Sequence, residues 1–201
     1  MRPPSAPSKR RSCAGRSLSA ETHPHPVALG DLLPDVPLLT AAGQTVSLAA
    51  RVRGRPAVLV LMRHLGCLPC REHLLEVARR RREFGDARLL CVTFVQPALL
   101  TAYERELELD GIEFLADPAR ATYAALGFER ASFARVWLHP AVWQRYAALL
   151  VRGRRLRPPG QDVYQLGGDA VIDAGGRLRR VFASAGPEDR PAVDELLAAL
   201  A

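Results

Sequence analysis

Two cysteines and two histidines stand three residues apart in the segment "LMRHLGCLPCREHL", residues 61 to 74. With the gaps written out, the pattern is His64-x-x-Cys67-x-x-Cys70-x-x-His73. These residue types support two kinds of chemistry. A Cys-x-x-Cys pair can cycle between a dithiol and a disulfide, whereas four cysteine and histidine side chains can bind zinc.

The elements around the pair favour redox chemistry. A continuous apolar run, "PAVLVLM" (residues 56–62), is typical of a buried parallel strand, and "REHLLEVARRRREF" (residues 71–84) has a helical pattern. Cys67 therefore opens a helix, where free N–H groups and the helix dipole lower a thiol pKa from about 8.5 toward 4 to 7. Cys70 follows one turn later, close enough to attack a mixed disulfide or a sulfenic acid on Cys67.

Three neighbouring side chains make this segment electropositive: Arg63, His64 and Arg71. Positive charge stabilises a thiolate, so we expect these residues to tune the sulfur. The residues thus predict Cys67 as the nucleophile, in an accessible position, and Cys70 as the resolving thiol. His64 is equally consistent with a loop histidine that faces solvent.

Two other interpretations of the pattern stay open. Zinc bound by His64, Cys67, Cys70 and His73 is less favoured, because zinc sites commonly combine two separated ligand pairs and the chain has no second cluster. If no zinc is bound, His73 is expected at the protein surface. The cysteines could also be an inert buried pair, although a strand-to-helix position is one that activates a thiol.

Four further side chains have weaker signals. Cys91 lies inside the apolar run "ARLLCVTFV" and is expected to be a small buried residue. Trp137 and Trp143 could line a substrate groove, although aromatic residues at this spacing more often belong to a core. Gln165 is a possible substrate contact, because it lies near the point where the chain should face the cysteines.

Composition restricts the class of protein. The chain has 201 residues, enough for one ample domain, and a net charge of +7. The first 26 residues hold five basic residues and one acid, so we expect a disordered basic tail followed by a single domain over residues 27–201. The charge left on the domain is mild, and its basic runs have no interleaved stacking aromatics, so we expect no nucleic-acid partner.

The chain also lacks several targeting and cofactor signals. No apolar run is long enough to span a membrane or to act as a secretory signal, so we expect a cytoplasmic protein with no membrane partner. No glycine-rich phosphate loop occurs, and we expect no cofactor. In a reducing compartment a Cys-x-x-Cys pair is more often catalytic or metal-binding than structural.

The wider pattern predicts an α/β fold. Strand-like and helical segments alternate three times between residues 56 and 128, which indicates crossover units on a parallel sheet. A longer amphipathic segment, residues 132–151, is interrupted by Pro140 and reads as a helical insertion. Two closing strands flank the turn at residues 174–176, and a last helix ends the chain.

The segments "GDLLPDVPLLTAAGQTVSL", "PAVLVLMRHLGCLPCREHL" and "DVYQLGGDAVIDAGGRLRRVFAS" resemble the peroxiredoxin-like branch of the alkyl hydroperoxide reductase/thiol-specific antioxidant (AhpC/TSA) family. The resemblance covers residues 30–200. It implies a thioredoxin-like fold with a mixed central sheet, helices on both faces and a helical insertion. It also implies thiol-based redox chemistry, with Cys67 and Cys70 matching the family's Cys-x-x-Cys.

Two departures from related motifs leave the substrate open. Peroxiredoxins carry Pro-x-x-x-Thr-x-x-Cys, whereas here His64 stands at the threonine position before Cys67. Thioredoxins carry a tryptophan before the first cysteine, and here that residue is Gly66. We therefore expect an antioxidant oxidoreductase that reduces peroxides or disulfides and is recycled by glutathione or thioredoxin. The competing class is a redox-sensing or binding module without turnover.

Overall fold

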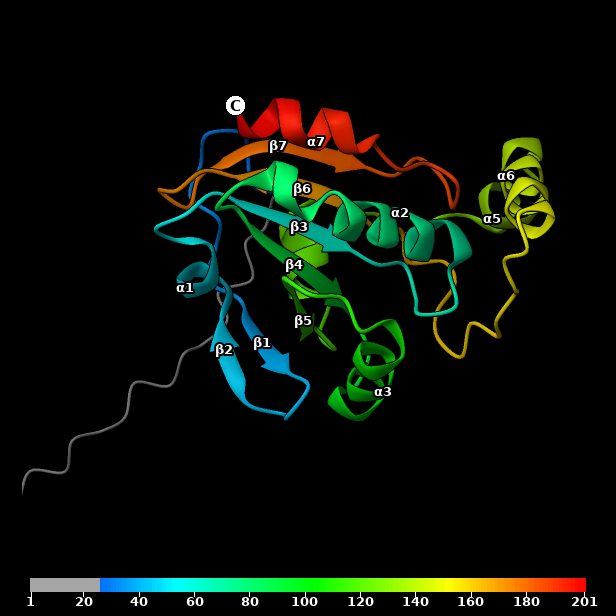
Figure 1. Cartoon of the computed structure of the whole chain (residues 1–201), viewed down its shortest axis with the longest axis horizontal. Helices are drawn as coiled ribbons and strands as arrows, with labels where there is room; N and C mark the ends of the chain where they lie inside the picture. The colour runs from blue at the N-terminus through cyan, green and yellow to red at the C-terminus, as the bar shows by residue number, and fades with distance from the viewer. Residues whose placement is uncertain (1–25) are drawn as a thin grey trace, which may run out of the picture.

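A mixed sheet lies at the centre of the part of the chain that the structure describes (Figure 1). The computed structural model describes residues 26–201, so the predicted tail lies outside the described residues except for Pro26. In these residues the sheet has seven strands in the order β2-β1-β5-β4-β3-β6-β7. The strands are β1 (Pro37–Thr40), β2 (Thr45–Ser47), β3 (Ala57–Leu61), β4 (Arg88–Thr93), β5 (Ile112–Ala116), β6 (Gly168–Ile172) and β7 (Leu178–Ala183).

The three central strands are parallel, as the apolar runs predict. β3 pairs with β4 and β4 with β5 in parallel register, and all five residues of β3 are buried. A parallel strand that is covered on both faces needs apolar residues on both sides, which explains the continuous run. β6 pairs antiparallel with β3, and β7 antiparallel with β6, which makes the sheet mixed.

Helices cover both faces of the sheet, which confirms the predicted fold class. They are α1 (Leu48–Val52), α2 (Leu68–Arg79), α3 (Pro97–Leu107), α4 (Ala121–Ala125), α5 (Phe133–Trp137), α6 (Pro140–Val151) and α7 (Val193–Leu200). Alternate residues of β3 point to opposite sides: Val58 and Val60 join a core with α2, α3 and α7, while Leu59 and Leu61 join a core with α1 and α4. Both cysteines of the motif belong to the first core.

Some element boundaries differ from the expected ones. α2 starts at Leu68 with Cys67 as its N-cap, as expected for a cysteine that opens a helix, and it stops at Arg79. A 3₁₀ turn (Arg81–Phe84) follows where the sequence pattern suggested continued helix, because the arginines there leave few apolar positions. Pro140 divides the insertion, as predicted, into α5 and α6.

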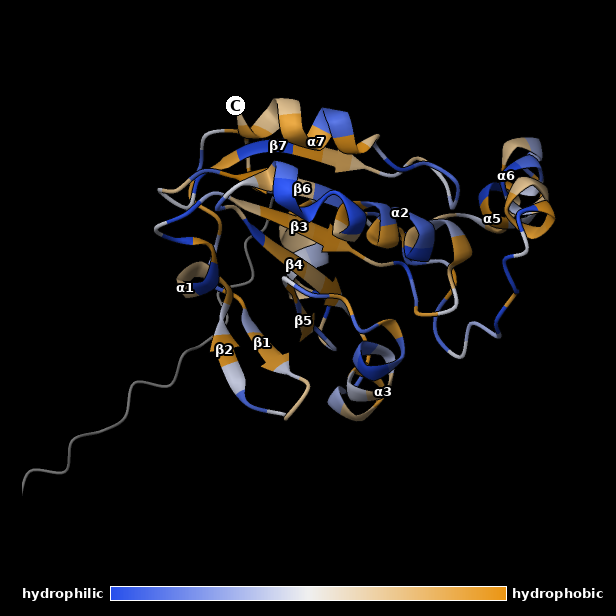
Figure 2. Ribbon diagram, in the orientation of Figure 1, coloured by the Kyte–Doolittle hydropathy of each residue, from blue (hydrophilic) through white to orange (hydrophobic). Residues whose placement is uncertain are grey.

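The two helices of the insertion lie at one edge of the molecule, beyond the start of α2 (Figure 1). Apolar residues fill the strands of the sheet, and they also recur on α5 and α6 (Figure 2). Among the described residues, no helix is both long enough and apolar enough to cross a membrane.

Candidate active site

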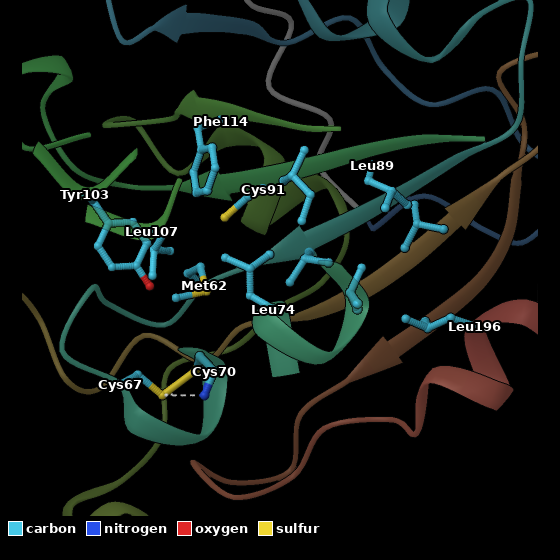
Figure 3. Close-up of a cluster of buried hydrophobic side chains, with 14 of the residues drawn as sticks. Met62, Cys67, Cys70, Leu74, Leu89, Cys91, Tyr103, Leu107, Phe114 and Leu196 are labelled. Carbon is cyan, nitrogen blue, oxygen red and sulfur yellow. Dashed lines mark hydrogen bonds between the residues drawn. A yellow bond between two sulfur atoms is a disulfide. The ribbon is translucent and has the colours of Figure 1, made fainter. Parts of the chain in front are cut away.

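Cys67 and Cys70 form a disulfide at the start of α2 (Figure 3). Their Cα atoms lie 5.4 Å apart, within the usual range for a disulfide. Cys67 is the N-cap residue, and the backbone N–H of Cys70 donates a hydrogen bond to the Cys67 sulfur at 3.4 Å. The free N–H groups of a helix start favour negative charge, so this position stabilises a thiolate on Cys67 when the pair is reduced.

The two sulfurs are enclosed in this disulfide form. Both cysteines have an exposed fraction of 0%, so the expectation of an accessible Cys67 is wrong for this state. A segment of residues 156–163, here called the cover loop, lies against residues 63–66, just before Cys67. A Cβ atom at Gly66 would approach the carbonyl oxygen of Pro158 to 2.7 Å, which shows how closely the loop is packed.

Three polar contacts hold the cover loop in place beside the cysteine segment. The backbone N–H of Leu65 donates to Oε1 of Gln161 at 2.9 Å. Arg157 forms an ion pair with Glu106 of α3, and an Arg63 guanidinium nitrogen donates to the carbonyl oxygen of Val163. The loop is therefore fixed to the residues that lead into the disulfide helix.

Arg63 is the cation next to Cys67. Its side chain is buried, and Nη1 lies 4.0 Å from the Cys67 sulfur. Nε has no hydrogen-bond partner among the described residues. Burial lowers the pKa of Arg63 to about 10 against the opposing influence of Tyr146 on α6, so the guanidinium is still charged at neutral pH. A charge in so dry a place acts strongly on a nearby thiolate.

The other two residues expected to make the segment electropositive differ from Arg63 in charge and contacts. His64 is buried, and burial, together with the charge of Arg63, lowers its pKa to about 4, so it is neutral at pH 7. Its predicted alternative position, facing solvent, is also wrong. Arg71 forms an ion pair with Glu106 at 2.5 Å, and it shares that carboxylate with Arg157.

His73 is buried and not at the surface, which corrects the sequence-based expectation. Its Nε2 lies 2.9 Å from Oδ1 of Asp169 on β6, and the other oxygen of Asp169 accepts from Arg190 at 3.1 Å. Burial by itself raises the pKa of Asp169, but His73 and Arg190 outweigh it and hold that pKa below its ordinary value. This buried charge cluster joins α2 to the sheet directly behind the disulfide helix.

The zinc interpretation gains no support from this geometry. In residues 26–201 no group of three or more histidine, cysteine or acidic side chains is arranged to hold a metal ion. Cys67 and Cys70 are bonded to each other, and His73 is turned toward Asp169.

Gln165 is buried, and its amide nitrogen donates to the backbone carbonyls of Phe128 and Leu166 at 3.2 and 3.0 Å. In this structure the side chain links two loops, and a substrate contact stays a prediction. Cys91 is fully buried in the core, as its apolar surroundings predict, and burial raises the pKa of its thiol.

A cavity of about 240 Å³ lies beside the disulfide. Its walls are mostly apolar, and Arg63 and His64 are the residues of the cysteine segment that bring polar groups to it. Gly66 also lines the cavity. The other lining residues belong to the insertion, the cover loop and the segment before α7: Val136, Trp137, Val142, Trp143, Tyr146, Leu156, Arg157, Pro159, Val163 and Pro187. The two tryptophans thus line a groove and are not core residues, with exposed fractions of 40% and 57%.

Sequence reasoning did not find Tyr146, Asp169 or Arg190. Asp169 had one available signal, since a lone acid at a fully buried strand position implies a buried partner. Tyr146 carries no local signal, because its role depends on how α6 packs against the cysteine segment.

Comparison with known proteins gives the family. The sequence model of the AhpC/TSA family matches residues 29–155. Peroxiredoxin-like 2C from Homo sapiens is 32% identical over 98 residues, which cover 48% of this chain and 43% of that protein. The Mus musculus protein of the same name is 29% identical over 133 residues, covering 59% of this chain and 54% of that protein. The chain thus spans about half the length of the curated relatives it matches.

Solved structures share the fold. Peroxidoxin BcpB from Mycobacterium tuberculosis superposes with a TM-score of 0.61 at 16% identity, covering 86% of this chain and 96% of that one. Reduced Prx3 from Vibrio vulnificus, solved in complex with H₂O₂, gives a TM-score of 0.58 at 18% identity, covering 87% and 99%.

The mixed sheet and the cysteine pair at the start of α2 define a thioredoxin-like protein with a peroxiredoxin architecture. Because the family model matches more than half of the residues, the chain belongs to the AhpC/TSA family.

Proposed function

We propose that this protein is a thiol-dependent antioxidant oxidoreductase that reduces peroxides or disulfides through Cys67 and Cys70. One observation carries the proposal: the bonded pair sits at the N-terminus of α2 with the Arg63 guanidinium 4.0 Å from the Cys67 sulfur. Helix start and buried cation both stabilise negative charge on Cys67. Cys67 is therefore the nucleophile, and Cys70 is the resolving thiol.

With a peroxide, the Cys67 thiolate attacks one oxygen, the O–O bond breaks, and the other oxygen leaves as an alcohol or water after taking up a proton. Cys67 then carries a sulfenic acid. The Cys70 thiol attacks that sulfur, water leaves, and the disulfide seen here forms. Glutathione or thioredoxin then reduces the disulfide to the dithiol with two electrons and two protons and is itself oxidised to a disulfide. With a disulfide substrate, the same attack gives a mixed disulfide that Cys70 resolves.

A redox-sensing module without turnover is the second candidate, and the enclosure of the sulfurs favours it. Both cysteines are 0% exposed, and the cover loop is tied to the segment that precedes them. If the loop has to open before a reductant reaches the disulfide, recycling is slow and the protein acts as a reporter of oxidation.

Turnover separates the two candidates. Peroxide and disulfide consumption would be measured with excess glutathione or with thioredoxin and its reductase. We expect many turnovers per protein and loss of all of them in Cys67→Ser. Cys70→Ser, treated with peroxide before any thiol is added, should react once and leave a sulfenic acid that dimedone traps. Cys91→Ala is the control, because Cys91 is a buried free thiol that is not part of the pair and should not affect turnover.

One oxidation per molecule with no recycling would support the sensor. Unchanged turnover in Cys67→Ser would rule out Cys67 as the nucleophile and overturn the proposal.

A further inference from the structure

Large apolar side chains are concentrated on the surface of the insertion. Of the ten that are exposed in residues 26–201, seven lie between residues 133 and 156. We call these seven residues the α5–α6 face: Phe133 (59% exposed), Trp137 (40%), Leu138 (66%), Trp143 (57%), Leu150 (42%), Val151 (89%) and Leu156 (59%). The helices that carry most of them lie at the edge of the molecule (Figures 1 and 2). An apolar concentration of this kind marks an interaction surface.

The sequence of α6 contains two apolar stripes, and the fold covers only one. Val142, Tyr146 and Leu149 recur at helical spacing and pack inward. Trp143 and Leu150 recur at the same spacing about a quarter turn away, and they are exposed. A helix that only covered a core would carry polar residues on this second stripe.

Within the sequence of the insertion and the cover loop, the charge has one sign. No aspartate or glutamate occurs from residue 131 to residue 161, whereas this stretch holds six arginines. Arg154 and Arg157 pair with acids of the body, Glu72 and Glu106. The other four are exposed and form no ion pair with any described residue: Arg135, Arg145, Arg152 and Arg155.

We propose that the α5–α6 face docks on the surface of a bilayer that contains anionic lipids. Exposed tryptophan, leucine and phenylalanine on a segment that also carries unpaired arginines suit the boundary between headgroups and acyl chains, where the apolar groups insert and the cations meet lipid phosphates. A protein partner would need an apolar patch surrounded only by acidic residues. An anionic leaflet offers an apolar interior and negatively charged headgroups over its whole surface. No spanning segment is needed for docking of this kind, so the absence of one in the described residues does not oppose it.

Docking would bring the cavity to the membrane. Trp137, Trp143 and Leu156 belong to the face and also line the cavity beside the disulfide. If the protein has the proposed oxidoreductase function, an apolar substrate could then pass from the lipid to the cysteines. The docking itself does not depend on any activity.

The two tryptophans provide a selective probe, because they are the only ones in the chain and both lie on the face. The full chain would be mixed with vesicles of phosphatidylcholine alone or with 30% phosphatidylglycerol, at low and high salt. We expect a blue shift of tryptophan emission and co-sedimentation with the anionic vesicles only, both weakened by salt. The same result with neutral vesicles, or no shift with either, would overturn the proposal.

A matched pair of variants locates the contact. The double variant Leu138→Glu, Val151→Glu changes two exposed residues of the face that do not line the cavity, and we expect it to lower vesicle affinity at least tenfold with an unchanged circular dichroism spectrum. Leu29→Glu changes an equally exposed leucine elsewhere (60%) and should bind like the wild type.

Retained binding in the double variant would assign the lipid contact to another part of the chain and overturn the proposal. A self-association that the double variant abolishes, in the absence of vesicle binding, would instead assign the face to a protein partner.

Discussion

Cys67 and Cys70 differ in what surrounds their sulfurs. The Cys67 sulfur accepts the N–H of Cys70 and lies next to the Arg63 guanidinium. Both contacts stabilise a negative charge on Cys67, so the two thiols of the reduced protein should differ in reactivity.

Arg63 should control that difference. We expect Cys67 in the reduced protein to be alkylated before Cys70 at pH 7. Arg63→Gln should slow the alkylation of Cys67 about tenfold, because a nearby positive charge lowers the pKa of a thiol by about one unit or more. Arg71→Gln is the control: its charge is paired with Glu106, so the rate should change less than twofold. Mass spectrometry of timed iodoacetamide reactions measures the alkylation rate of Cys67 in both variants. Equal rates would show that Arg63 does not stabilise the thiolate.

His64 makes the stability of the protein depend on pH. Its pKa is about 4 in the folded protein, against an ordinary value of 6.5, because burial and then Arg63 disfavour its charged form. Between those values the unfolded chain binds a proton that the folded protein does not, so acidification favours unfolding.

We expect the free energy of unfolding to fall by about 2–3 kcal/mol from pH 7 to pH 4.5 through this residue, at about 1.4 kcal/mol for each pKa unit. His64→Gln should lack that part of the fall. The exposed His139 provides the control, and His139→Gln should behave as the wild type does. Urea titrations at several pH values measure the slopes; identical slopes in all three proteins would show that His64 is not buried in its neutral form.

At the scale of elements, the cover loop and the start of α2 form one unit. Gln161 reaches across to the N–H of Leu65, and Gly66 leaves room for the backbone of Pro158. The loop also forms part of the wall of the cavity beside α5 and α6. We therefore expect opening of the loop to govern how fast the disulfide is reduced.

Gln161→Ala should speed reduction of the disulfide by dithiothreitol about fivefold, because it removes one hydrogen bond worth about 1 kcal/mol from the closed state. Gly66→Ala should act in the same direction, since its Cβ would meet the Pro158 oxygen at 2.7 Å. Gln144→Ala on the exposed side of α6 is the control and should leave the rate unchanged. If dithiothreitol reduced the disulfide at the same rate in the wild type and in all three variants, opening of the cover loop would not limit the reduction.

At the scale of the whole molecule, Asp169 joins segments that are far apart in the chain. Its two oxygens meet His73 of α2 and Arg190 of the segment before α7, and Arg190 also donates to the carbonyl oxygen of Leu61 at 2.7 Å. All three side chains are largely or fully buried. Such a cluster is costly to break, because removal of one charge leaves the others buried without a partner.

Asp169→Asn should therefore lower the free energy of unfolding by about 3–5 kcal/mol. Because the folded pKa of Asp169 is lowered, its contribution is present above the unfolded pKa and is lost as the pH falls through the folded one, so the variant's deficit should shrink below about pH 4. Asp110→Asn, at an exposed position, should change stability by less than about 0.5 kcal/mol. Thermal and urea unfolding measure the three proteins; a deficit that is the same at pH 3 and pH 7 would mean that the loss does not come from the charge.

Sequence patterns were enough to predict the central strands, the crossover helices and the place of the cysteines at a strand-to-helix junction. The signals for these features are local: a continuous apolar run is typical of a buried parallel strand, and the helix that follows it begins near Cys67. Pro140 likewise divided the insertion, because proline cannot continue a helix through its own position.

Only the tertiary structure decided what surrounds the cysteines. His73 meets Asp169 from 96 residues away, and Leu65 meets Gln161 across the same separation, so no local spacing encodes either contact. The neutral state of His64, the pairing of Arg71 and the uncovered stripe of α6 follow from which segments pack there. Burial and charge at a site depend on all the neighbours together, and only the fold assembles those neighbours.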